Sequence, residues 1–389
     1  MISICGKEWK EYKIPKRLID KYSSDFSISE NLSKFYLRRN FNKEDILIKD
    51  ITYDNLNIFS NDKDFLLGTK IIIDIIKNKK KTLILGDYDV DGISSITILS
   101  SFFRHLGHPF KYVIPDRFVD GYGPNIKLLE QSLDKEIDNI IFLDCGSNSH
   151  KVIDYLNKKK IKSIIVDHHI INDLDMPKSD VIINPTKNNL KFIKNNVCAA
   201  TLTFFFVDLI NKKLNSKFKL NDYFIFSIIS TICDLMPLRG FNRKILTIGF
   251  KDLAIKNKGL KKLISNNLKK KLSYQDIGFI IGPLINSSGR IAKANDVVEL
   301  FLSENDDKID TIINKINNYN EIRKKIEQDN LNLINLKKYY GKNLIFIYNK
   351  EFHEGTIGII AAKISQLFKK PCFILTESHD LLKCSIRSG

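Results

Sequence analysis

The chain has 389 residues, 43% of them hydrophobic, and carries a formal net charge of +17. This length and hydrophobic content predict two packed domains and exclude a disordered or fibrous chain. The longest apolar stretches fall well short of a membrane-spanning helix, and the N-terminus lacks the apolar region of a secretory signal, so we expect a cytoplasmic protein with no membrane partner.

The six cysteines are scattered and form no CxxC pair, which argues against a zinc cluster or a disulfide framework and fits a reducing compartment. The positive charge favours a polyanionic partner, because Lys and Arg that neutralise phosphates release condensed counterions. A lysine-rich composition imposed by the codon usage of a genome would give the same excess, so charge alone leaves both interpretations open.

The first 80 residues mix short apolar clusters with charge, and we expect this N-terminal segment to be mostly helical. From residue 81 strand-like and helix-like stretches alternate. Apolar runs of strand length occupy 82–85, 139–143 and 163–166, and helical patterns occupy 94–106, 125–133 and 151–160. Such alternation is typical of an α/β domain whose parallel sheet is covered on both faces, and we place this catalytic domain at residues 81–308.

The later part of this range reads as helical, with loop-like segments at 234–243 and 282–292. A long amphipathic helix follows, with apolar residues at helical spacing from Ile312 to Ile326, and we expect a connecting helix within residues 309–340. A smaller α/β domain is expected at 341–389, from strands at 343–348 and 372–375 and a helix within 355–368. It has no closing helix, so we expect it to be truncated.

Acidic residues or histidines follow each of the three predicted strands. They are Asp87, Asp89 and Asp91 after the first, Asp144 after the second, and Asp167, His168 and His169 after the third. Ligands bind at the carboxyl ends of the strands in an open α/β sheet, so these side chains should meet at one edge. So many carboxylates repel one another unless cations neutralise them. Asp and His together suit Mn²⁺, and Mg²⁺ less well, so we expect one or two of these ions.

The segment from Gly86 to Gly92 has Asp at every second position. On an extended backbone this spacing would place the three carboxylates on one side, and Gly92 would permit the turn into the next helix. Alone, the segment also fits an ordinary surface turn, and it matches an EF-hand loop poorly because no Glu stands at the required position. The three strand ends taken together favour a metal site.

These motifs resemble those of the DHH phosphoesterase superfamily, and further segments resemble its RecJ family of 5′ exonucleases. The superfamily motifs are matched by Asp89 and Asp91, by Asp144, by 167–169 and by Asp234. The RecJ-like segments are 115–117, 120–123, 240–243, 282–290 and 353–359, and residues 385–388 resemble the start of the nucleotide-binding motif of the accessory DHHA1 domain. The resemblance covers roughly residues 80 to 389 and implies a DHH domain joined by a long helix to a DHHA1-type domain.

The resemblance also implies roles for individual residues. Metal ions would be held by Asp89, Asp91, Asp144, His168 and Asp234, with Asp144 as a bridge. Asp87 would hold a metal or support a ligand, and His169 would contact the scissile phosphate or orient a ligand. The 5′-terminal phosphate would be bound by Arg117, Ser385 and Arg387. The residues that would line the substrate channel or contact phosphate are Asn286, Arg290 and His353. Arginine suits a terminal phosphate because its planar fork bonds two oxygens.

The implied function is a metal-dependent nuclease that degrades single-stranded DNA from 5′ to 3′ and releases 5′-mononucleotides, in DNA repair and recombination. A single-strand-binding protein and a helicase are the expected protein partners. The alternatives are a DHH phosphodiesterase acting on oligoribonucleotides or cyclic dinucleotides, and a non-catalytic nucleic-acid-binding scaffold.

The chain departs from the family pattern at three positions. Leu85 stands where many relatives have a metal-binding His, while Cys384 and Ile386 replace small residues and would narrow the pocket for the terminal nucleotide. The family's OB fold is absent from this sequence, so we expect weaker DNA affinity than in a complete relative.

Overall fold

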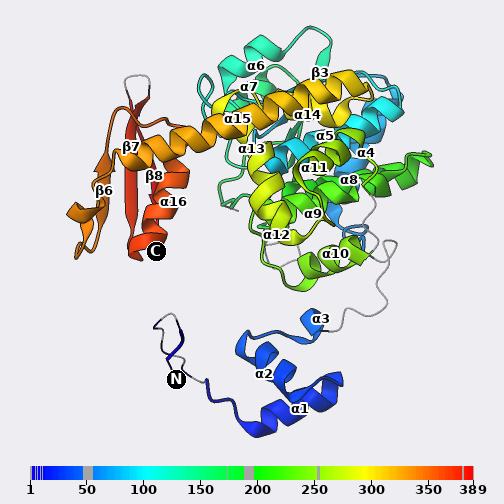
Figure 1. The fold of residues 1–389 in the computed structure, drawn as a ribbon. Coiled ribbons are helices and arrows are strands. Elements are labelled where there is room, and N and C mark those ends of the chain that lie inside the picture. The colour runs from blue at the N-terminus through cyan, green and yellow to red at the C-terminus, as the bar shows by residue number, and fades with distance from the viewer. Residues whose placement is uncertain are drawn as a thin grey trace. The chain divides into compact units, whose positions relative to one another are not determined.

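The computed structural model describes residues 2–4, 6, 8, 10, 12–46, 56–172, 174–187, 197–251, 255–378 and 381–388. Its contacts divide the chain into two units, and the fold of each can be followed in Figure 1. The first unit joins Met1–Asn57 to Pro237–Leu253, and the second joins Ile58–Met236 to Ala254–Gly389. No helix among these described residues has the length and apolarity needed to cross a membrane.

The first unit is helical, in agreement with the pattern of its sequence. It contains α1 (Lys16–Phe26), α2 (Glu30–Arg38), α3 (Lys43–Ile46) and α10 (Gly240–Lys251). Helix α2 begins after Ser29, whose hydroxyl accepts the N–H of Leu32 at 3.3 Å. The prediction of a loop at 234–243 is wrong for its last four residues, since α10 begins at Gly240.

The second unit contains a five-stranded parallel sheet in the order β2-β1-β3-β4-β5. The predicted strands are confirmed as β1 (Lys81–Gly86), β3 (Ile137–Leu143) and β4 (Lys162–Val166). Two strands were missed, β2 (Phe110–Val113) and β5 (Val181–Ile183). With four and three residues, they are too short to show a clear pattern.

Helices cover both faces of this sheet. On one face, α6 (Ile126–Ser132) and α7 (His150–Lys158) pack on inward side chains such as Leu85 and Phe142. On the other face lie α5 (Val90–His105) and α8 (Ala199–Leu214), and α5 is buried along nearly its whole length. Burial on both faces explains why the strands read as continuous apolar runs. It also places Leu85 in the sheet core, so the family's metal-binding His has no counterpart at this position.

The second unit contains further helices and helical turns before residue 306. Its elements are α4 (Lys63–Lys77), the 3₁₀ turn Leu220–Tyr223, α9 (Phe224–Cys233), α11 (Lys258–Asn267), α12 (Tyr274–Asp276), the π-helical turn Ile277–Ile281, α13 (Gly282–Ile291) and α14 (Asn295–Leu302). The prediction of a loop at 282–292 is wrong, because α13 occupies almost all of it. Its glycines, which read as loop signals, serve close packing instead. A Cβ on Gly282 would come within 2.5 Å of Cys233 Sγ, and one on Gly289 within 2.5 Å of the Tyr88 carbonyl oxygen.

The predicted connecting helix is confirmed as α15 (Asp306–Asn332), which Figure 1 shows as one uninterrupted helix. After the 3₁₀ turn Leu336–Tyr339 comes a small α/β part with β6 (Ile345–Tyr348), α16 (Ile357–Phe368), β7 (Cys372–Ser378) and β8 (Leu381–Arg387). Strand β6 pairs parallel to β7, and β8 pairs antiparallel to β7. The strand β8 was missed, although apolar and polar residues alternate from Leu382 to Arg387.

Candidate metal centre

Carboxylates and imidazoles converge at the carboxyl edge of the five-stranded sheet. The centre of the group is His168, in the loop after β4. Its Nε2 atom lies 3.2 Å from Asp144 Oδ1, 3.4 Å from Asp234 Oδ2 and 3.6 Å from Asp91 Oδ2. Asp144 follows β3, and Asp234 ends α9. Side chains up to 143 residues apart in the sequence, from Asp91 to Asp234, therefore face one position.

The ligand atoms form three overlapping sets, each within a span of 4.8 Å. These sets are Asp87, Asp89 and Asp144; Asp91, His168 and Asp234; and Asp144, His168 and His169. Asp144 and His168 each belong to two sets. Two neighbouring ions would share Asp144, which supports the role of a bridging carboxylate.

The surroundings of Asp144 fit a cation. Its side chain is buried, and its backbone has a φ of 61°, a strained value for a residue other than glycine. Oδ1 lacks a hydrogen-bond donor among the described residues, and the His168 contact at 3.2 Å does not have hydrogen-bond alignment. Asp87 Oδ1 is buried and equally unpartnered within that part of the chain. Buried carboxylate oxygens without donors are costly, and a divalent ion would satisfy both.

The protonation of these carboxyls leads to the same conclusion. Burial, followed by the charge of Asp91, raises the pKa of Asp234 to about 8. Burial and neighbouring carboxylates also raise the pKa of Asp87 and of Asp144 well above the ordinary Asp value. A bound cation would reverse this effect, because it favours the ionised form of each carboxyl. The donor set of carboxylates with imidazole suits Mn²⁺ and accommodates Mg²⁺.

The prediction that the three aspartates share one side of an extended backbone is wrong for Asp91. Helix α5 begins at Val90, and Asp89 is its N-cap, accepting the N–H groups of Asp91 and Gly92 at 2.9 and 3.2 Å. Asp91 therefore lies in the first helical turn. Gly92 is needed because a Cβ there would come within 2.3 Å of the Asp87 carbonyl oxygen.

Asp91 also anchors a second helix. Its two carboxylate oxygens accept the N–H groups of Ala199 and Ala200 at 2.7 and 2.8 Å, which are the first residues of α8. The carboxylate thus satisfies donors at the positive end of that helix. Nevertheless burial raises its pKa. Any metal bound by Asp91 would therefore have a fixed position relative to the start of α8.

His169 is oriented by two neighbours to which the sequence analysis assigned no individual role. Its Nδ1 atom lies 2.7 Å from Asp167 Oδ1, and its Nε2 atom lies 3.0 Å from the hydroxyl of Tyr122. Burial opposes ionisation of Asp167, but the hydrogen bond from His169 and backbone donors outweigh it and lower its pKa to about 2. The same hydrogen bond raises the pKa of His169 to about 9. Asp167 is therefore an anchor for a cationic imidazole.

Two predicted phosphate ligands lie on a neighbouring surface of the second unit. The guanidinium of Arg117 stacks 4.1 Å above the ring of Tyr88, and its Nε donates to the Gly289 carbonyl at 3.0 Å. Arg290 is largely buried and donates to the Gly355 carbonyl at 3.1 Å. Burial, followed by the charge of Arg117, lowers the pKa of Arg290 to about 10. The two arginines line different cavities, Arg117 one of about 750 Å³ and Arg290 one of about 240 Å³.

Asn286 and His353 have defined contacts beside these arginines. The side-chain oxygen of Asn286 accepts the N–H of Val90 at 3.1 Å, so Asn286 holds the start of α5. The ring of His353 packs against Phe118 at 5.5 Å, and its Nδ1 accepts the N–H of Gly355 at 3.1 Å. Through His353, the small α/β part thus contacts Phe118, the residue next to Arg117.

Ser385 and Arg387 lie beside the start of α16. A Cβ added to Gly358 would lie 3.5 Å from Ser385 Oγ and 3.9 Å from Arg387 Nη2. Alternate residues of a strand face opposite ways, so Cys384 and Ile386 point away from this position, and both are exposed. That they narrow the nucleotide pocket stays a prediction.

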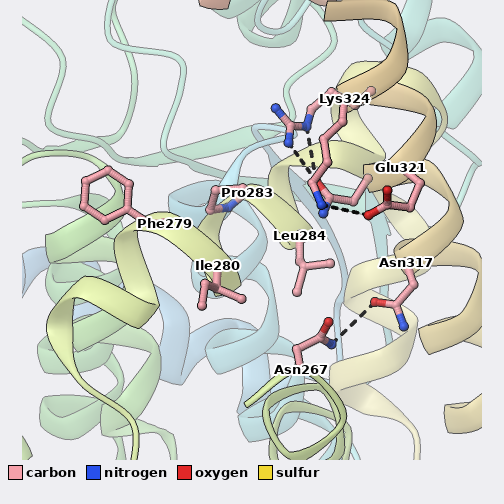
Figure 2. Close-up of a pocket in the computed structure, with 10 residues that line it drawn as sticks. Asn267, Phe279, Ile280, Pro283, Leu284, Asn317, Glu321 and Lys324 are labelled. Atoms are coloured by element: carbon pink, nitrogen blue, oxygen red, sulfur yellow. Dashed lines mark hydrogen bonds and ion pairs between the residues drawn. The ribbon is translucent and has the colours of Figure 1, made fainter. Parts of the chain in front are cut away.

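Arg323 on α15 is a further basic residue near the site, and sequence reasoning missed it. It lines a cavity of about 240 Å³ with Cys233, Asn286 and Arg290, and also the adjoining cavity of about 220 Å³ drawn in Figure 2. Its Nη1 donates to Glu327 at 2.9 Å. In the sequence it looks like any basic residue on the polar face of an amphipathic helix, so no local signal marks it.

The cavity in Figure 2 adjoins the site along α13 and α15. The Lys324–Glu321 ion pair, at 2.7 Å, lines this cavity, and Phe279 points away from that pair. A larger cavity of about 750 Å³ is lined by Arg117, Tyr88 and Phe118 among others. Arg117 thus borders enough space for a nucleotide.

Comparison with known proteins agrees with this geometry. Residues 81–231 match the model of the DHH family, N-terminal domain. The single-stranded-DNA-specific exonuclease RecJ of Haemophilus influenzae is 25% identical over 345 residues, which cover 82% of this chain and 59% of that protein. This chain is therefore similar to the DHH family over residues 81–231, and to RecJ over most of its length. It spans about three-fifths of the length of the first curated relatives that it matches.

Solved RecJ structures share the fold. The structure of RecJ from Thermus thermophilus in complex with Mn²⁺ matches with a TM-score of 0.82 at 21% identity, over 97% of this chain and 54% of that one. A structure of exonuclease RecJ bound to manganese matches with a TM-score of 0.75 at 23% identity, over 84% and 82%. The α/β architecture predicted for this chain is therefore confirmed.

Proposed function

We propose that this protein is a metal-dependent exonuclease that hydrolyses single-stranded DNA from its 5′ end and releases 5′-mononucleotides. The observation that carries the proposal is the set of buried carboxylates around His168, two of which have an oxygen without a hydrogen-bond donor among the described residues. The relatives named as single-stranded-DNA-specific exonucleases support the choice of substrate. Repair and recombination of DNA in the cytoplasm would be the setting.

The metal ligands we propose are Asp89, Asp91, Asp144, His168 and Asp234, with Asp87 as a further ligand or support. Bound Mn²⁺ or Mg²⁺ would activate a water molecule and neutralise charge on the attacked phosphate. Asp144 lies in two of the ligand sets and would hold both ions in place.

His169 would act on the scissile phosphate directly. Its bond to Asp167 keeps the imidazole protonated near neutral pH, and Tyr122 fixes the direction of Nε2. A cationic donor in a fixed position stabilises the negative charge that develops on a phosphate oxygen, and it costs little reorganisation.

The polarity of the reaction would come from the basic residues. Arg117 cannot swing freely, because it is stacked on Tyr88 and bonded to Gly289, so it would present a fixed fork to a terminal phosphate. Ser385 and Arg387 would complete that grip, while Asn286, Arg290 and His353 would line the path of the strand.

The parts of the chain would divide this work. We propose that residues 81–308 are the catalytic domain, 309–340 the connecting helix, 341–389 the accessory DHHA1-type domain and 1–80 an N-terminal segment. A helicase and a single-strand-binding protein would deliver and hold the single strand.

A labelled substrate tests the proposal. The protein is incubated with Mn²⁺ and a single-stranded DNA that carries distinguishable labels at its two ends, beside the matching duplex and an EDTA control. Early release of labelled mononucleotide from the 5′ end, on single strands and with metal only, is expected. Hydrolysis of dinucleotides without degradation of DNA would overturn the proposal in favour of a small-substrate phosphodiesterase, and metal binding without any turnover would indicate a scaffold.

A further inference from the structure

The first unit carries a basic surface that the metal centre does not use. Two segments about 200 residues apart meet there: the end of α2 with the turn after it, and the start of α10. We call this surface the arginine–aromatic cluster; it consists of Phe35, Tyr36, Arg39, Phe41, Arg239 and Arg243.

Guanidinium groups stack on the rings of this cluster. The Cζ atom of Arg39 lies 4.8 Å from the centre of the Phe35 ring. The Cζ atoms of Arg239 and Arg243 lie 5.2 and 5.4 Å from the centre of the Phe41 ring. The rings of Phe35 and Phe41 are themselves 6.5 Å apart. The result is a layered arrangement of flat cations and flat rings.

Among the residues that the structure describes, few partners neutralise the positive charge of the cluster. Arg239 donates to the backbone carbonyls of Arg39 and Asn40, which carry no net charge. Arg243 Nε has no hydrogen-bond partner among the described residues, and in that same set no carboxylate forms an ion pair with the three arginines. The nearby acid, Asp45, accepts the backbone N–H groups of Asn42 and Gly240 at 3.0 and 2.6 Å.

The cluster is also accessible. Arg39 and Arg239 are exposed, and the side chain of Phe35 is 47% exposed. The cluster therefore offers an exposed ring and exposed guanidinium groups side by side to a ligand.

We propose that the arginine–aromatic cluster is a second binding site for single-stranded nucleic acid, separate from the metal centre. Unpaired bases would stack on Phe35 and on the guanidinium of Arg39, and the phosphates between them would pair with the arginines. The identity of the ligand rests on the proposed function, because the strand that is degraded would be the strand that is held.

The positive charge and the exposed ring of the cluster together favour a single strand over other ligands. A duplex hides its base faces, so it would meet only the charges. An acidic peptide would pair with the arginines but would leave the exposed ring unused. A single strand satisfies both at once, and it does so without reading a sequence.

Binding measured without turnover tests the proposal. The full chain in EDTA is titrated against a fluorescent oligothymidine of about 30 nucleotides, and Kd is followed by anisotropy. The variants are Phe35→Leu, which removes the ring but keeps an apolar side chain, and Arg39→Gln. The matched control is Arg17→Gln, which removes one exposed charge from α1 of the same unit. Thermal melting verifies that each variant is folded.

We expect Phe35→Leu to raise Kd about 5- to 150-fold, the usual range for loss of one stacked base, while Arg17→Gln changes it less than about twofold. On an abasic strand of the same length, Phe35→Leu should bind like the wild type, because no base remains to stack. Arg39→Gln should lower the slope of log K against log salt by about 0.7. A purely structural role of Phe35 would affect both strands equally and would overturn the proposal.

The outcomes separate this proposal from the proposed function. Lost affinity in the variants, with wild-type turnover of a short oligonucleotide in Mn²⁺, supports both. Lost affinity in a protein that degrades nothing supports the binding site and removes the nuclease. If the variants bind DNA like the control, or if polyglutamate competes as well as oligothymidine, the cluster is not a site for single strands.

Discussion

The metal centre and the arginine–aromatic cluster each hold more charge of one sign than their neighbours neutralise, but in opposite settings. The carboxylates of the metal centre are mostly buried, and their pKa values rise as a result. The arginines of the cluster are mostly exposed, and flat rings support them. Burial makes the carboxylates depend on a small ion that fits between them, whereas exposure lets the arginines accept a long, flexible polyanion.

The comparison predicts that substitutions at the metal centre affect turnover, whereas substitutions at basic residues affect binding. The largest effect is expected for Asp144→Asn. Loss of the bridging carboxylate should lower mononucleotide release by about 10³-fold, since several kcal/mol of charge stabilisation are lost. Affinity for single-stranded DNA in EDTA should stay within about twofold of the wild type. Retained turnover would remove Asp144 from the site.

A smaller loss of turnover is expected for Asp167→Asn. The amide cannot hold a cationic His169, so kcat should fall about 10- to 100-fold, as for other residues that orient a metal-site side chain. Stabilisation of the protein by Mn²⁺ should persist, because Asp167 is not a proposed ligand. A variant that loses this stabilisation would show that Asp167 holds the ion, contrary to our assignment.

Arg117→Lys separates binding of the terminal phosphate from chemistry. Lysine keeps the charge but cannot form the planar, two-oxygen fork, so the preference for a 5′-phosphorylated over a 5′-hydroxyl strand should fall about tenfold. The comparison uses kcat/KM on the two strands. An unchanged preference would show that Arg117 does not bind the 5′ phosphate.

The smallest effect is expected for Tyr122→Phe. This change removes one neutral hydrogen bond to His169 and keeps the ring, so kcat should fall about two- to fivefold, in line with a net hydrogen-bond contribution of about 1 kcal/mol. DNA binding should not change. A loss as large as that of Asp167→Asn would mean that Tyr122, rather than Asp167, fixes the imidazole.

The α/β architecture and the residues at the sheet edge were predictable from the sequence, because they depend on local patterns. Apolar runs of strand length marked β1, β3 and β4, and the carboxyl ends of parallel strands share an edge wherever the chain goes between them. Long-range contacts were not predictable in this way. Helix α13 was read as a loop, since its Gly and Pro residues signal turns locally and only its packing against Cys233 and Tyr88 makes it helical.

The sequence by itself determined which residue types stand at the strand ends, and hence that this protein has the donors for a divalent cation. Only the tertiary structure decided that Asp91 also holds the start of α8, that Asp167 charges His169, and that Ser385 and Arg387 face α16. It also brought Arg239 and Arg243 onto Phe41. These arrangements join segments far apart in the chain, and their geometry follows from packing, which no local pattern of residues encodes.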